Sequence, residues 1–395
     1  MTEYEAIVIG AGPAGSTAAR EIASRGHSVL LLDRASFPRD KPCGGGVTVR
    51  CAALFPFDIT HVVEHVVTGA ILSAPNAPVV TREAHAPLTY KTQRRRLDAF
   101  LVERAQEAGV EFRDAHAVRT ITERADGVFE VRAANGDTHT ARALIGADGA
   151  NGVVGTFLGF EHPADAAVAL EGNLRFPDGI PQWLHGRVAL SLGLMPGGYG
   201  WLFPKGDHIN VGVGGWKHVA GPRLRAALDA YTRSYGWNPD DLDAVRGHNL
   251  PMLRAGVVLT ARGVALIGDA AGLVDPLSGE GITAAVASGL AVSSPASDYL
   301  RGVTPDMRGY QLALEREVIP DLVASRGLME VFHAYPAPFV WAAQHSGRVW
   351  RAMCGAISGG KGYDAIVQST GPLAPTLAPL AKVARRLTVA KYGPR

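Results

Sequence analysis

The stretch YEAIVIGAGPAGSTAAREIASRGHSVLLLDR, residues 4–34, decides the fold of this chain. Its first apolar run, Ala6 to Ile9, is typical of a buried parallel strand. Gly10, Gly12 and Gly15 follow in the spacing G-x-G-x-x-G and open an alanine-rich helix. That helix leads into a second short apolar run before the stretch ends. The pattern predicts a strand–helix–strand unit of the Rossmann type and an α/β fold.

The three glycines and the acid after the second strand explain how such a unit holds a dinucleotide. The first glycine permits the tight turn, the second lets the backbone approach a pyrophosphate, and the third lets helix and strand pack closely. The helix N-terminus offers free N–H groups, and Asp33 is placed to accept from ribose hydroxyls. Both NAD and FAD use this unit. The residues expected to line the dinucleotide are Gly10, Gly12, Ala14, Gly15, Asp33 and Arg34.

A second stretch, GVALIGDAAGLVDPLSGEGITAAVASGLAV at residues 263–292, favours FAD. It resembles the second FAD signature of the p-hydroxybenzoate hydroxylase-like flavoproteins, a class that includes aromatic hydroxylases and geranylgeranyl reductases. The resemblance implies that the aspartate contacts the ribityl and pyrophosphate region. It also implies that N–H groups at the start of the following helix stabilise negative charge on the reduced flavin. The matching positions are Asp269, Pro276, Gly279, Gly281 and Ile282.

The segment RRRLDAFL, residues 94–101, carries the same resemblance. It matches the family pattern R-x-x-F-D-x-x-L, with Leu97 in place of phenylalanine. The resemblance implies that Arg94 reaches the FAD from the start of a helix. The strand after that helix is expected to bring Val118 near the adenine.

The segment ARALIGADGANGVVG, residues 141–155, resembles the D-G motif of the class at Asp148 and Gly149. Gly152 stands where the family often has serine, so a hydrogen bond from that serine is missing here. Asp148 either contacts the cofactor or caps a turn, and the sequence leaves both interpretations open.

The segment RDKPCGGGVTVR, residues 39–50, resembles the K-P-C-G-G-G segment of the geranylgeranyl reductases. Successive glycines let backbone pass close to a flavin ring without obstruction by side chains. The resemblance makes Cys43, Gly44 and Gly46 cofactor contacts, and it makes the Cys43 thiol a candidate acid or redox group. The alternative is that Cys43 is a small buried hydrophobic residue.

The stretch MPGGYGWLFPKGDHINVGVGG, residues 195–215, contains the P-x-x-Y-x-W-x-F-P motif of the same reductases. On a strand, Tyr199, Trp201 and Phe203 share one face. That face is expected to form an apolar wall for an isoprenoid chain, with the tyrosine hydroxyl as its polar group. The alternative is an ordinary aromatic core strand.

The resemblance implies an FAD-dependent reductase that saturates C=C bonds of a prenyl chain on a lipid, diphosphate or quinone. Such a reaction takes a hydride from the flavin and a proton from a nearby acid. The candidate catalytic residues are Cys43, Tyr199 and Trp201, and either Cys43 or Tyr199 delivers the proton. NAD(P)H or a ferredoxin, hence a donor protein, supplies the electrons.

Two other functions remain open at this point. An FAD monooxygenase or halogenase acting on an aromatic or polyketide substrate shares the cofactor motifs, although the hydroxylases usually carry histidine where this chain has Gly272. A flavin-bearing carrier of prenyl lipids without catalytic activity would share both the motifs and the aromatic stretch.

Composition limits the remaining functions. The chain has 395 residues and a net charge of +2, too small to create a strong positive field that would attract nucleic acid. Three cysteines and scattered histidines indicate neither a disulfide framework nor a metal site. The few cysteines suit a reducing cytosol and no apolar run is long enough to span a bilayer, so a cytoplasmic protein is expected. The basic tail APLAKVARRLTVAKYGPR is either a solvated helix or a peripheral contact with an anionic membrane.

The expected organisation is a discontinuous FAD-binding domain, an antiparallel substrate-binding sheet and a helical C-terminal region. The cofactor motifs assign residues 1–70, 94–155 and 250–300 to the FAD-binding domain. Short alternating runs assign residues 71–93 and 156–249 to the sheet. Residues 301–395 show apolar positions at helical spacing.

Overall fold

A parallel sheet carries the N-terminal stretch, as the sequence predicts. The computed structural model describes residues 2–160, 166–252, 256–360, 362–369 and 374–392. The sheet has eight strands. Its main path is β17 (Thr260–Ala261), β18 (Val264–Leu266), β11 (Thr138–Gly146), β1 (Thr2–Ile9), β2 (Val29–Leu32) and β8 (Glu111–Arg113). The strands from β18 to β8 run parallel, while β10 (Phe129–Ala133) and β9 (Val118–Glu123) add an antiparallel extension to β11.

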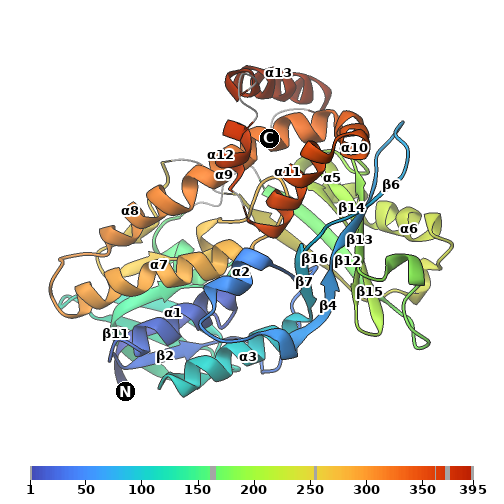
Figure 1. The fold of residues 1–395 in the computed structure, drawn as a ribbon. Coiled ribbons are helices and arrows are strands. Elements are labelled where there is room, and N and C mark those ends of the chain that lie inside the picture. The colour runs from blue at the N-terminus through green and yellow to red at the C-terminus, as the bar shows by residue number, and fades with distance from the viewer. Residues whose placement is uncertain (1, 161–165, 253–255, 361, 370–373, 393–395) are drawn as a thin grey trace.

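Three helices pack together beside this sheet because alanine and glycine let them approach closely. Helix α1 (Pro13–Ala23) contacts both α3 (Arg94–Glu107) and α7 (Ile282–Leu300). A Cβ on Gly289 would lie 2.6 Å from the carbonyl oxygen of Ala14, so α7 reaches the start of α1 only through that glycine. The two stretches identified from sequence therefore lie side by side (Figure 1).

A second sheet, largely antiparallel, has seven strands. Their order is β16 (Asp243–Pro251), β12 (Ala166–Arg175), β15 (His208–Trp216), β14 (Tyr199–Lys205), β13 (Arg187–Leu192), β5 (Gly69–Ser73) and β6 (Val80–Glu83). A small third sheet joins β3 (Gly46–Thr48), β7 (Thr89–Thr92) and β4 (Val63–Val67). Residues 71–93 thus contribute to both of these sheets, which sequence periodicity does not reveal.

The two faces of β14 bury different residues. Leu202 packs in a core with α6 (Leu224–Ser234), whereas Tyr199 and Phe203 pack on the opposite side with residues of the C-terminal helices. Those helices are α8 (Arg308–Glu317), α9 (Ile319–Ala334), α10 (Pro336–His345), α11 (Gly347–Ser358), α12 (Tyr363–Ser369) and α13 (Ala374–Tyr392). In Figure 1 α9 to α13 lie across the top of both sheets. The predicted fold class is confirmed: a parallel nucleotide-binding sheet, an antiparallel sheet and a C-terminal helical region.

Candidate functional site

The first glycine turn is shaped by close contacts between backbone segments. Gly10 has φ +102°, and a Cβ there would lie 2.3 Å from the carbonyl oxygen of Ala147. A Cβ on Gly15 would lie 1.8 Å from the carbonyl oxygen of Gly10. These two glycines are therefore required by the packing of β1, β11 and α1. Gly12 is different, because a Cβ there would only touch guanidinium nitrogens of Arg39 and Arg94 at 3.7 Å.

Two arginines stand over this turn, held by one buried carboxylate. Arg94 donates through Nε and Nη2 to the two oxygens of Asp98, each at 2.7 Å. Arg39 Nη1 lies 3.0 Å from the same carboxylate. Burial opposes the charge of Arg94, but Asp98 raises its pKa above the ordinary value. The helix N-terminus at Gly12 carries no side-chain cap, so its N–H groups and two guanidiniums fit the phosphates of a dinucleotide.

The acid at the end of β2 lies where the sequence places it. Asp33 accepts from the backbone N–H of Ala11 at 2.8 Å and of Ala35 at 2.9 Å. Its neighbour Arg34 is exposed, and Val118 begins β9 against the core of the parallel sheet. These positions suit a ribose and an adenine, and their roles remain predictions.

The second glycine turn presents a carboxylate of its own. Asp269 lies 3.0 Å from Lys41 Nζ and 3.6 Å from His248 Nε2. Burial opposes its charge, yet Lys41 and His248 hold the pKa of Asp269 below its usual range. A Cβ on Gly281 would lie 3.1 Å from this carboxylate. Gly281 caps α7 without any side chain, and Glu280 satisfies only part of the first turn by accepting from the Thr283 N–H, which leaves N–H groups at the helix start.

The segment 43–46 lies across the second sheet and is tied to it by backbone groups. The Cys43 N–H donates to Glu171, and Lys205 Nζ donates to the Cys43 carbonyl oxygen at 3.0 Å. A Cβ on Gly44 would lie 2.6 Å from the Phe203 ring. Cys43 is half-buried, and its Sγ accepts from the Gly45 N–H at 3.3 Å. A side chain at position 44 is thus excluded by the aromatic strand itself.

The predicted aromatic row forms on one face of β14. Ring centroids of Tyr199 and Trp201 are 5.8 Å apart, and those of Trp201 and Phe203 are 5.9 Å apart. The indole N–H of Trp201 donates to Asn210 at 2.8 Å, which fixes the ring. The Tyr199 hydroxyl donates to the carbonyl oxygen of Ser278, in the loop that contains Pro276 and Gly279. The row therefore lies against the loop that opens α7.

Asp148 caps the short helix α4 (Val153–Phe157). One of its oxygens accepts from the N–H groups of Val153 at 2.6 Å and Val154 at 3.2 Å. A Cβ on Gly152 would lie 2.1 Å from the carboxylate, which explains why serine is absent there. The turn-capping interpretation is thus observed. The other oxygen, Oδ1, is buried and makes no hydrogen bond to the described residues, so a cofactor contact remains a prediction.

We expect Asp148→Ala to lower the free energy of unfolding by about 1 kcal/mol, the usual cost of losing a cap. Denaturant unfolding of the apo protein measures this change. An unchanged midpoint would contradict the capping role, while a parallel FAD titration reports whether the second oxygen also contacts the cofactor.

Two buried groups near the aromatic row titrate around neutrality. Burial, reinforced by the ammonium of Lys205, lowers the pKa of Lys91 to about 7. Burial also raises the pKa of Glu280 to about 7, against the hydrogen bond that it accepts from the Thr283 N–H. Below about pH 7 the buried Glu280 makes stability fall as the pH rises. Above about pH 7 the buried Lys91 makes stability rise with pH.

The sign for Lys91 gives a pH-dependence prediction. Between about pH 7 and its unfolded pKa of 10.5, the unfolded chain keeps a proton that the folded chain has lost, so stability rises with pH. We expect a higher free energy of unfolding at about pH 9 than at about pH 7, and a smaller rise in Lys91→Met. Lys205 keeps part of the rise because burial lowers its pKa too. An identical rise in wild type and Lys91→Met would contradict the assignment.

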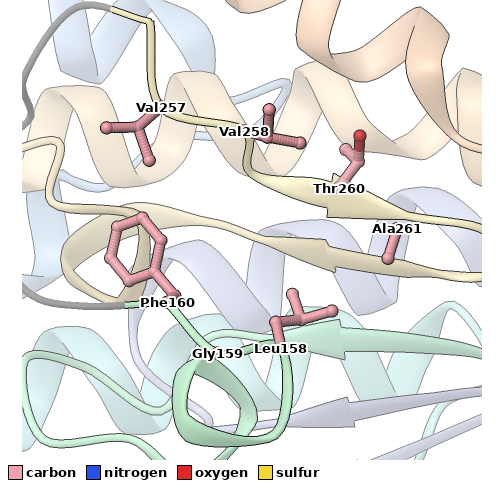
Figure 2. A pocket seen from close by; sticks show the side chains of 7 residues that line it. All are labelled: Leu158, Gly159, Phe160, Val257, Val258, Thr260 and Ala261. Atoms are coloured by element: carbon pink, nitrogen blue, oxygen red, sulfur yellow. The ribbon is translucent and has the colours of Figure 1, made fainter.

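A pocket of about 300 Å³ lies elsewhere, between the end of α4 and the approach to β17. Figure 2 shows its lining, mostly apolar, and none of the candidate site residues contributes to it. Within the described part of the chain, no three histidine, cysteine or acidic residues are grouped to hold a metal ion. Searching the same residues finds no helix with both the length and the hydrophobicity to cross a membrane.

Comparison with known proteins identifies the class and then the relatives. Residues 3–200 match the FAD binding domain family, to which this chain belongs. The chain is 31% identical to the chloroplastic geranylgeranyl diphosphate reductase of Oryza sativa, covering 82% of this chain and 74% of that protein. It is 32% identical to the menaquinone reductase of Mycolicibacterium smegmatis, covering 75% and 78%. The resemblance to geranylgeranyl reductases is confirmed, and the protein is an FAD-dependent oxidoreductase related to them.

Solved structures support the fold. A geranylgeranyl bacteriochlorophyll reductase-like protein from Thermoplasma acidophilum has a TM-score of 0.76 at 23% identity, over 93% of this chain and 98% of that one. The flavin-dependent brominase Bmp2 has a TM-score of 0.75 at 18% identity, over 99% and 100%. At these identities both similarities establish the fold alone.

Several residues of the site are missed by the sequence motifs. They are charged and amide side chains around the motif segments: Arg39, Lys91, Glu171, Lys205, Asn210 and His248. Lys41 is part of the K-P-C-G-G-G motif, but the motif does not predict its ion pair with Asp269. Arg39 and Lys41 both precede the segment 43–46 in the sequence, and that clustering of cations was the available signal. Glu171 and His248 lie on strands far from any motif, and nothing in the local pattern marks them.

Proposed function

We propose that this protein is an FAD-dependent reductase that saturates C=C bonds in a prenyl chain carried by a lipid, a diphosphate or a quinone. The observation that carries the proposal is the row Tyr199–Trp201–Phe203, which lies against the loop opening α7 and against the segment 43–46. The relatives point to the same class, since geranylgeranyl diphosphate and menaquinone both carry prenyl chains.

Different residues of the chain would bind different parts of the cofactor and the substrate. Arg39, Arg94 and the α1 N-terminus would hold the phosphates, and Asp33 would hold a ribose. Asp269 would hold the ribityl chain, and the N–H groups of Gly281 and Ile282 would donate hydrogen bonds that stabilise negative charge on the ring. When bound, reduced FAD supplies the hydride. The aromatic row would hold the prenyl chain and exclude water, because its rings present apolar faces.

The proton donor follows from the hydrogen bonds. Tyr199 already donates its hydroxyl proton to Ser278, and burial raises the pKa of Tyr199 above its ordinary value. Both effects make it a poor acid. Cys43 Sγ differs, because it accepts from the Gly45 N–H and interacts electrostatically with the Arg94 guanidinium, which leaves its own proton available. We therefore propose that Cys43 holds the transferred proton.

An anaerobic reaction tests the function. The bound flavin is reduced by light, a geranylgeranyl substrate is added, and flavin reoxidation and product mass are followed together. The proposal expects reoxidation without oxygen and a product heavier by hydrogen only. Oxygen-dependent turnover with oxygen or halogen incorporated would favour a monooxygenase or halogenase, and a flavin that stays reduced with every prenyl substrate would favour a carrier. Repeating the assay with NADH, NADPH or reduced ferredoxin identifies the donor.

We further propose a peripheral membrane contact through α13. Leu380, Val383 and Leu387 recur at helical spacing and are each about half exposed (51%, 52% and 51%). Exposed Lys382, Arg385 and Arg386 on the same helix suit anionic lipids.

Sedimentation with anionic vesicles tests this contact. The wild-type protein should be recovered with the vesicles. The double variant Val383→Glu with Leu387→Glu should abolish recovery, because it places two carboxylates where the helix would meet the lipid. Equal recovery of both proteins would contradict the contact.

A further inference from the structure

Lys91 is a buried cation that the proposed mechanism does not use. It lies on β7, is only 4% exposed, and its Nζ stands 3.5 Å from the centroid of the Phe203 ring. A Cβ on Gly46 would lie 3.1 Å from the same nitrogen. The ammonium therefore lies where the segment 43–46 crosses the aromatic strand.

In the part of the chain that the structure describes, this ammonium has no paired anion. Among the described residues, none accepts a hydrogen bond from Lys91 Nζ and none forms an ion pair with it. The neighbouring Lys205 differs, because it donates to the Cys43 carbonyl oxygen and acts electrostatically on Glu171. Glu280 and the Cys43 thiol act on Lys91 only through their electrostatic fields. Buried charges in proteins are normally paired, and an unpaired one is costly.

Contact with an aromatic face offsets only part of that cost. A cation over phenylalanine gains about 0.5–2 kcal/mol, less than the several kcal/mol lost when an ammonium leaves water. A hydrophobic residue at position 91 would fill the same space without the penalty. The chain instead keeps a cation at the junction of the segment 43–46 and β14, within the electrostatic field of Glu280, the residue two before α7.

We propose that Lys91 is the cationic partner of an oxyanion that binds at this junction during the reaction. Two sources could supply this chemistry: the negative charge that a flavin ring carries after reduction, and a phosphate group on the prenyl substrate. The inference rests on the proposed function, and it assigns to Lys91 a binding role that none of the family motifs contains.

Binding of an anion has a measurable consequence in the unaltered protein. In its absence Lys91 has a pKa of about 7, so above that pH the amine is mostly neutral. An anion beside it favours the charged form and raises this pKa. Binding at about pH 8 should therefore take up a proton, which calorimetry in buffers of different ionisation enthalpy detects.

Two probes distinguish the sources. Sulfite adds to an oxidised flavin and leaves negative charge on the ring, so its Kd reports cations that stabilise the charged ring. Inorganic pyrophosphate stands in for the substrate's phosphate group. Both are titrated into the FAD-loaded protein, into Lys91→Met and Lys91→Arg, and into Lys217→Met as a control that removes an exposed cation.

We expect the Kd of one probe to rise about tenfold or more in Lys91→Met, to recover in Lys91→Arg and to stay unchanged in Lys217→Met. A change for sulfite assigns the flavin as the source, and a change for pyrophosphate assigns the substrate. Unchanged Kd values for both probes in Lys91→Met overturn the inference. If that variant does not fold, proton uptake by the wild type decides: no uptake with either probe overturns it.

The same preparations separate this inference from the proposed function. FAD content and prenyl reduction are measured alongside the two titrations. If the protein binds a probe through Lys91 but reduces no prenyl chain, the anion site is supported and the proposed function is refuted. If the protein reduces prenyl chains but Lys91→Met leaves both Kd values unchanged, the proposed function is supported and the anion site is refuted.

Discussion

Gly12→Ala should give a folded protein that has lost its yellow colour. Gly12 has an ordinary φ of −79°, and a Cβ there meets only guanidinium nitrogens of Arg39 and Arg94 at 3.7 Å. The apo chain therefore accommodates the methyl group. The same methyl group lies between the α1 N-terminus and the two guanidiniums, where we propose that the pyrophosphate binds. We expect FAD affinity to fall about a hundredfold, roughly 2.7 kcal/mol.

The measurement pairs a flavin fluorescence titration with thermal unfolding of the apo protein. Gly15→Ala is the contrasting variant, because its Cβ would lie 1.8 Å from the carbonyl oxygen of Gly10 and the fold itself should fail. Wild-type FAD affinity in a folded Gly12→Ala protein would refute the assignment of this turn to the cofactor.

Trp201→Ala should leave FAD bound and reduce prenyl turnover about a hundredfold. Trp201 stands in the middle of the aromatic row, between Tyr199 and Phe203, and its indole is fixed by Asn210. Removing it opens the wall that would hold the prenyl chain against the reacting ring. It also admits water, which weakens the positioning of the reacting carbons.

Leu202→Ala is the matched control on the same strand. Leu202 is fully buried on the opposite face, in the core with α6. We expect it to cost about 2–5 kcal/mol of stability while turnover per folded molecule stays near wild type. If both variants lose turnover in proportion to their lost stability, the aromatic row is an ordinary core and the substrate wall is refuted.

The nucleotide-binding half of the fold is predictable because its signals are local. The apolar run at Ala6 to Ile9 becomes part of β1, and the spacing of Gly10 and Gly15 is imposed by contacts within a few residues or with the adjacent strand. Period-two aromatics likewise place Tyr199 and Trp201 on one face of a strand. Such patterns follow from the regular geometry of the backbone, so the spacing of residues in the sequence is enough to predict them.

The electrostatic half of the site is not predictable in the same way. Arg39 and Asp98 meet across 59 positions of sequence, and Glu171 on β12 accepts from the backbone N–H of Cys43 across 128 positions. In the sequence, Lys91 is one more polar residue before a helix. Only the structure shows that its Nζ lies over the Phe203 ring. Charged residues carry no periodic signal for burial, so only tertiary contacts reveal which of them are removed from water.

Asp148 shows how a motif can be found without its role being fixed. The sequence leaves a choice between a cofactor contact and a turn cap, and the hydrogen bonds to Val153 and Val154 establish the cap. They also account for Gly152, since a side chain there would strike the carboxylate. The buried second oxygen keeps the cofactor contact open to experiment.

The central claim is that two distant glycine turns hold one FAD with its reactive ring beside the aromatic row. A crystal structure of the FAD-loaded protein tests it most directly. The account predicts phosphates between Gly12 and the guanidiniums of Arg39 and Arg94, and a flavin ring between the start of α7 and the face formed by Tyr199, Trp201 and Phe203. A flavin ring on any other surface of the molecule would contradict it.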